Sequence, residues 1–143
     1  MRVVLDTNVV VSALVWGGTP LKLLQAAANG DIDLYTSPVL MAELREVLER
    51  EHLASRLVRQ YASVESAISS YGELAIRVSP LVAPRVVAGD PDDDHVLATA
   101  VAANAHLIVS GDKKHLLVIR SYKDMPIISV ADAVNILYEG ARP

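Results

Sequence analysis

The stretch Val3-Val4-Leu5-Asp6, near the start of the chain, decides the fold class. Three consecutive aliphatic residues without alternation are typical of a short strand that is buried in a sheet. An acidic residue follows directly, so we predict that this strand presents the carboxylate of Asp6 at its carboxyl end.

Outward from this strand, the sequence alternates strands with helices. Thr19-Pro20 and Ser37-Pro38 each pair a helix N-cap with a proline at the first helical position. The alternation predicts a parallel sheet with helices on both faces. Further strands are predicted over residues 34–36, 75–78, 107–109 and 125–129. Helices are predicted over residues 9–16, 20–28, 38–50, 53–74 (in one or two pieces), 92–104 and 130–138, with a loop over 80–91 and a short basic segment over 113–117.

Length and composition favour a single domain over residues 1–143. Apolar residues make up 52% of the chain, which allows a sizeable core. The net charge of −4 is unlike that of a general polyanion binder, and the absence of cysteine excludes disulfides, thiolate metal sites and a cysteine nucleophile. No apolar run reaches membrane-spanning length. We expect a cytoplasmic protein that makes no membrane contact.

Two acidic residues are predicted near the carboxyl ends of strands. Asp6 follows the first strand, and Asp112 lies shortly after the strand over residues 107–109. Open α/β sheets bind ligands in the crevice at the carboxyl ends of their strands. We therefore expect both carboxylates at the same edge of the sheet.

Two further acidic residues are predicted on the apolar faces of helices. Glu43 lies three residues after Leu40 and four before Val47, so it joins the apolar stripe of its helix. Asp94 heads a similar stripe in a first helical turn, where the helix dipole stabilises an anion. Buried carboxylates are costly unless they are paired or bind metal. Mg²⁺ or Mn²⁺ prefers oxygen ligands and would activate a water molecule toward a phosphodiester bond.

Each acid taken alone also has a simpler interpretation. An Asp after a strand is often a turn former or a helix cap, and the neighbouring Asp92 and Asp93 fit a cap followed by a solvated loop. Glu43 fits a residue at the edge of the apolar face whose carboxylate reaches solvent. Pattern alone leaves the metal site and these ordinary roles open as alternatives.

Four motifs in order resemble those of the PIN-domain family. Residues 5–9, Leu-Asp-Thr-Asn-Val, resemble its opening motif, and Ser37-Pro38 through Glu43 is similar to the second. Residues 94–100, an Asp followed by an apolar, alanine-rich helix, resemble the third. Residues 107–112, a strand that runs into Ser-Gly-Asp, resemble the fourth. Order and spacing match over nearly the whole chain.

This resemblance implies an α/β/α sandwich with endoribonuclease activity that depends on Mg²⁺ or Mn²⁺. Asp6, Glu43 and Asp94 would be the principal metal-site acids, with Asp112 as a more variable fourth. Many small members of the family are toxins of toxin–antitoxin pairs, are often dimeric, and are inhibited by an antitoxin from a neighbouring gene. An RNA substrate, an antitoxin partner and a homodimer are therefore expected.

The resemblance also implies supporting roles. Thr7 and Asn8 would organise the first loop, with Asn8 hydrogen bonded near the acids. Ser110 stands where many relatives have Thr, and it keeps the hydroxyl group. Asp93 is a register alternative to Asp94 as the third acid.

The basic, aromatic and histidine residues give weaker evidence for RNA or metal binding. Lys113 and Lys114 form a basic patch next to Asp112, which is a candidate for binding an RNA backbone or equally a solvated face. Trp16 and the scattered tyrosines are expected to pack rather than to stack on bases. No close-set metal pair is expected among the histidines His52, His95, His106 and His115.

Two classes of rival function remain open, an Asp-nucleophile phosphatase and a non-enzymatic phospho-receiver or degenerate binding module. A phosphatase with Asp6 as covalent nucleophile commonly has a second acid two residues later, where this chain has Asn8. A phospho-receiver usually carries paired acids after the first strand, whereas here the acids lie on helices. A phosphorylated Asp6 species would favour the phosphatase. A non-enzymatic PIN-fold binding module would keep its partner after Asp6→Asn and show no metal-dependent cleavage.

Overall fold

The central sheet explains how distant acids can meet. The computed structural model describes residues 1–57, 60, 61, 63–81 and 91–139. Within these ranges the strands form a six-stranded sheet in the order β3-β2-β1-β4-β6-β5. All neighbouring pairs are parallel except β5 and β6, a short antiparallel edge that the sequence analysis did not predict. The strands are β1 (Arg2–Leu5), β2 (Asp33–Thr36), β3 (Ile76–Arg77), β4 (Leu107–Val109), β5 (Ser121–Tyr122) and β6 (Met125–Ile128).

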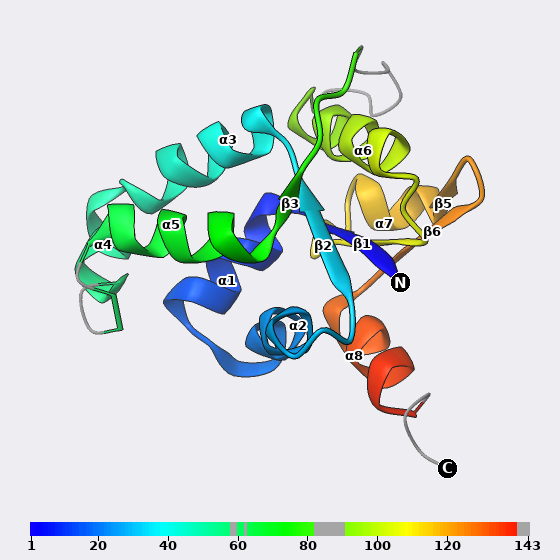
Figure 1. Ribbon diagram of the computed structural model, residues 1–143. Coiled ribbons are helices and arrows are strands. Elements are labelled where there is room, and N and C mark those ends of the chain that lie inside the picture. The colour runs from blue at the N-terminus through cyan, green and yellow to red at the C-terminus, as the bar shows by residue number, and fades with distance from the viewer. Residues whose placement is uncertain (58–59, 62, 82–90, 140–143) are drawn as a thin grey trace.

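Helices join the strands and cover both faces of the sheet (Figure 1). The helix predicted over residues 53–74 is two helices, α4 and α5, and the short helix α7 occupies part of the predicted basic segment. The loop predicted over residues 80–91 lies mostly outside the described residues, and residue 91 begins α6. The helices are α1 (Thr7–Val15), α2 (Gly18–Ala28), α3 (Pro38–Leu48), α4 (Glu51–Leu57), α5 (Val64–Leu74), α6 (Pro91–Ala103), α7 (Leu116–Ile119) and α8 (Val130–Glu139).

Alternate residues of the central strands pack into two separate cores. Val3 and Leu5 of β1 join apolar residues of α1, α2, α3, α5 and α8. Val4 faces the other way and packs with residues of α6, α7 and β6. Because successive side chains of a strand point to opposite faces, the two clusters are the two sides of one sheet. The predicted three-layer α/β/α sandwich with a mainly parallel sheet is confirmed.

The junction between α1 and α2 is a sharp bend at two glycines. Gly17 and Gly18 both have positive φ, at +75° and +61°, which glycine adopts at little cost. Gly17 is the N-cap of α2, so the N-cap predicted at Thr19 is wrong by two residues. Among the described residues, no single helix is long and apolar enough to cross a membrane. α1 and α2 meet that test of length and composition only as a pair bent by 98°.

The aromatic residues divide between the core and the surface. Tyr71 is buried among apolar side chains as predicted, and this burial raises the pKa of its hydroxyl group. Trp16 is 56% exposed, so the packing role predicted for it is wrong. The guanidinium carbon of Arg56 lies 4.0 Å from the centre of a Trp16 ring, in a cation–π contact at the surface.

Candidate active site

Asp6 lies at the carboxyl end of β1, where the strand passes into α1. Its backbone N–H donates to the carbonyl oxygen of Val109 at 2.9 Å, which fixes Asp6 beside the end of β4. The Asp6 side chain is buried, and its Oδ2 accepts a hydrogen bond of 2.9 Å from the hydroxyl group of Ser110. A residue that follows β4 therefore orients the carboxylate that follows β1.

Ser110 also links Asp6 to Asp112. Its Oγ accepts the backbone N–H of Asp112 at 2.9 Å. The Asp112 carboxylate in turn accepts the backbone N–H groups of Lys114 and His115, at 3.0 and 3.1 Å. Asp112 thus closes the turn that leads into α7. Asp6 and Asp112 reach the same edge of the sheet, as predicted.

The pKa of Asp112 is lowered from its ordinary value. Burial alone would raise this pKa, but the hydrogen bond with the Asp93 carboxyl and those from His115 and Lys114 outweigh the effect of burial. Hydrogen bonds to the charged form of an acid favour its ionisation. Asp112 is therefore an anion at neutral pH.

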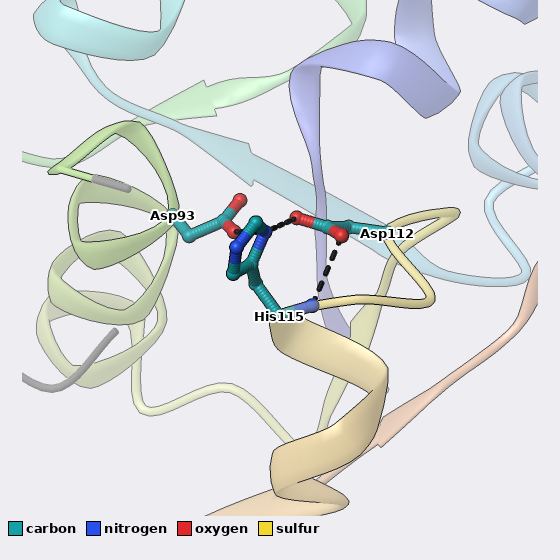
Figure 2. A group of neighbouring side chains, drawn as sticks. All are labelled: Asp93, Asp112 and His115. Atoms are coloured by element: carbon teal, nitrogen blue, oxygen red, sulfur yellow. Dashed lines mark hydrogen bonds and ion pairs between the residues drawn. The ribbon is translucent and has the colours of Figure 1, made fainter. Parts of the chain in front are cut away.

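α6 brings a second carboxylate to Asp112. Asp93 lies in the first turn of α6, and its Oδ2 is 4.0 Å from Nδ1 of His115. The same Nδ1 is 3.2 Å from Oδ2 of Asp112. Figure 2 shows the three side chains facing one another from α6, the turn after β4 and the start of α7. One ligand atom from each lies within 4.8 Å of the others, a spacing that a single cation can bridge.

Asp94 lies beside this group without being one of its members. Asp93 and Asp94 are both buried, at 4% and 8% relative exposure, whereas Asp92 is exposed as expected. Successive residues of a helix point about 100° apart, so the two buried acids face different surroundings. The metal-site role predicted for Asp94 stays a prediction. Its register alternative Asp93 is the acid that the structure places with Asp112 and His115.

Glu43 reaches the start of α1 from α3. It is half-buried, and its Oε2 accepts a hydrogen bond of 3.1 Å from the hydroxyl group of the buried Thr7. Thr7 directly follows Asp6, so the contact brings α3 to the first strand end. The hydroxyl groups of Ser37 and Thr99, 2.9 Å apart, tie the start of α3 to α6. The supporting role expected of Thr7 thus has a structural basis.

Three predicted residues lie on the exposed rim of the site, namely Asn8, Lys113 and Lys114. The hydrogen bond expected from Asn8 to the acids is not observed among the described residues. Lys113 and Lys114 directly follow Asp112 and add positive charge at this edge. Their part in substrate binding stays a prediction.

His115 is the site residue that sequence reasoning missed. Two of the other histidines have different surroundings: His52 is exposed on α4, and Nδ1 of His106 accepts the backbone N–H of Arg2 at 2.9 Å. His115 meets carboxylates instead, one of them only three residues earlier in the chain. A histidine three residues after a site acid, in a tight turn, was the available signal.

The chain is similar to a known protein family over most of its length. Residues 2–114 match the family model of the PIN domain. The chain belongs to the PIN-domain family. It is 32% identical to an uncharacterized protein of Methanocaldococcus jannaschii over 117 residues, which cover 79% of this chain and 72% of that protein.

This PIN domain is also similar in fold to a solved structure. The match is a chain in the crystal structure of VapBC2 from Rickettsia felis bound to a DNA fragment from their promoter. The TM-score is 0.61 at 14% sequence identity, with 90% of this chain and 98% of that chain covered. PIN domains are generally nucleases, so the acids at the carboxyl edge of the sheet are the candidate nuclease site.

Proposed function

We propose that this PIN domain is a metal-dependent endoribonuclease. Its site would comprise Asp6, Glu43, Asp112 and one of two adjacent acids of α6, of which the geometry favours Asp93 over Asp94. The observation that carries the proposal is the set of hydrogen bonds from Asp6 through Ser110 to Asp112, whose carboxylate lies within 4.8 Å of a ligand oxygen of Asp93. Residues from opposite ends of the chain thereby place negative charge at one edge of the sheet.

The donor set fits a divalent cation such as Mg²⁺ or Mn²⁺. Carboxylate oxygens are the preferred ligands of such ions. Ligand oxygens of Asp93 and Asp112 lie within 4.8 Å of each other, and two ionised carboxylates repel unless a proton or a cation lies between them. When bound, the cation would lower the pKa of a water molecule and stabilise charge on the phosphate.

The protein's part is to hold these acids in fixed positions. Ser110 fixes one oxygen of Asp6, and Thr7 fixes one oxygen of Glu43. Both donors are buried hydroxyl groups close to the main chain, so neither carboxylate swings freely. Preorganised charge of this kind stabilises a transition state without reorganisation during the reaction. Lys113 and Lys114 would position the RNA backbone beside the acids.

RNA cleavage by the purified protein tests this proposal. We expect end-labelled RNA of mixed sequence to be cut with Mg²⁺ or Mn²⁺ and to stay intact with chelator. Asp6→Asn should abolish cleavage while the protein stays folded, because removing one crowded anion relieves repulsion. Asp33→Asn is the matched control, because Asp33 is exposed at the start of β2. Cleavage that persists in chelator or in Asp6→Asn would contradict the proposal.

We also propose that the protein is the cytoplasmic toxin of a toxin–antitoxin pair and forms a homodimer. Support comes from its family and from the fold shared with a chain of VapBC2, a toxin–antitoxin complex. Co-expression with the products of the adjacent genes should yield a stable complex in which RNA cleavage is inhibited. Light scattering of the isolated chain should give twice the mass of 15.4 kDa. A monomer that no neighbouring product binds would contradict this part.

A further inference from the structure

We infer that His115 is a metal ligand of this site and gives the site a preference for Mn²⁺ over Mg²⁺. The inference rests on the proposed function, because it concerns the cation that the same acids would hold. It adds a nitrogen ligand, which the acidic motifs do not contain, to the carboxylates already described.

The position of the His115 ring is set by Asp112. The backbone N–H of His115 donates to Oδ1 of Asp112, and ring Nδ1 lies 3.2 Å from Oδ2 of the same carboxylate. The backbone contact fixes the main chain of His115, and the ring contact leaves Nδ1 between the two carboxylates, 4.0 Å from Oδ2 of Asp93 (Figure 2). The Asp93 side chain is 6% exposed and that of His115 is 39% exposed. In this group the Asp93 carboxylate is therefore buried, and the His115 imidazole is partly exposed to solvent.

The type of ligand decides which ion the group prefers. Mg²⁺ is a hard cation that binds nitrogen poorly and keeps several of its waters. Imidazole nitrogen suits first-row transition metals better than it suits Mg²⁺, and Mn²⁺ shares with Mg²⁺ a preference for carboxylate and water ligands. Two carboxylates with one imidazole therefore favour Mn²⁺, with further coordination positions left for water and phosphate. Without His115 the remaining all-oxygen set would discriminate less between the two ions.

The competing explanation is that His115 only orients Asp112 by a hydrogen bond. His115→Asn separates the two roles, because the Asn amide can place an N–H group near the position of Nδ1 but supplies no nitrogen ligand to a metal ion. His52→Asn is the matched control, since His52 is exposed on α4. Circular dichroism would confirm that both variants fold.

Electron paramagnetic resonance of Mn²⁺ tests the inference without measuring activity. Pulsed spectra of the Mn²⁺-loaded wild type should show coupling to ¹⁴N, which should change to ¹⁵N coupling in protein made with ¹⁵N-histidine. His115→Asn should lose the nitrogen coupling and bind Mn²⁺ about tenfold or more weakly. Its affinity for Mg²⁺, measured by competition, should change much less. His52→Asn should behave as the wild type does.

The outcomes separate this inference from the proposed function. Wild-type spectra without nitrogen coupling, or an unchanged preference for Mn²⁺ in His115→Asn, would overturn the role of His115. Chelator-sensitive RNA cleavage would then still support the nuclease. Conversely, nitrogen coupling without cleavage of any RNA would support the ligand and contradict the nuclease. The ¹⁵N-histidine spectra need no variant, so the inference stays testable even if His115→Asn does not fold.

Discussion

The hydroxyl group of Ser110 donates a hydrogen bond to the carboxylate of Asp6, at 2.9 Å and across 104 positions of sequence. Both residues are buried, and each directly follows a central strand of the parallel sheet. Ser110 also accepts the backbone N–H of Asp112. One hydroxyl group thus fixes the distance between two strand ends and between two acids of the candidate site.

Replacing Ser110 with Ala should damage both stability and activity. Asp6 would lose a donor and the Asp112 N–H would lose its acceptor. We expect a loss of about 1–3 kcal/mol in the free energy of unfolding. Cleavage should slow by about tenfold or more, as for other groups that orient a metal site. Ser110→Thr keeps the hydroxyl and should retain more of both. Urea unfolding and RNA cleavage rates of the two variants test this, and wild-type values for Ser110→Ala would refute it.

The role of Glu43 in metal-dependent cleavage can be tested by comparing it with Glu46, an exposed acid on the same helix. Glu43→Gln removes the charge but keeps an oxygen that can accept from Thr7. We expect metal-dependent cleavage to fall by about tenfold or more with little change in thermal stability. Glu46→Gln is the control, because Glu46 is exposed on α3. Equal cleavage rates in the two variants would show that Glu43 has no part in the site.

We expect the three consecutive acids at the start of α6 to differ in how much each contributes to Mn²⁺ affinity. Asp93→Asn should cause the largest loss of Mn²⁺ affinity, because Asp93 belongs to the group with Asp112 and His115. Asp92→Asn should have no effect, because Asp92 is exposed. Asp94→Asn tests the register preferred from the motif resemblance. Mn²⁺ titrations of all three measure the order, and a larger loss in Asp94→Asn than in Asp93→Asn would restore Asp94 as the third acid.

The end of α6 provides a stability test away from the site. Asn104 has a φ of +50°, and the chain closes there through Ala105 N–H to the carbonyl oxygen of Ala100 at 3.0 Å. Asn and Gly tolerate this left-handed conformation, whereas a β-branched residue does not. We expect Asn104→Val to lower the free energy of unfolding by about 1–2 kcal/mol, and Asn104→Gly to be nearly neutral. Denaturant unfolding compares them, and equal stabilities would contradict the assigned backbone conformation.

The periodicity of apolar residues in the sequence predicted which edge of the sheet carries the acids, but it could not identify every residue of the candidate site. The apolar run before Asp6 and the stripe around Glu43 are periodic signals, and both residues lie where those signals placed them. Asp93 and Asp94 are adjacent at the start of a helix with apolar residues on several sides, so its periodicity does not favour one register. His115 lies in a turn, where no periodicity applies and only the three-dimensional contact reveals it.

The cooperation of Asp6 and Asp112 tests the central claim most directly. Both Asn variants keep an oxygen that can accept the hydrogen bonds made to Asp6 and Asp112, so each removes charge with little change in shape. Single-turnover RNA cleavage would be measured for the wild type, Asp6→Asn, Asp112→Asn and the double variant. If the acids serve one site, the double variant should lose about as much rate as the more damaged single variant. Losses that multiply, or an Asp6→Asn variant that cleaves at the wild-type rate, would contradict the account.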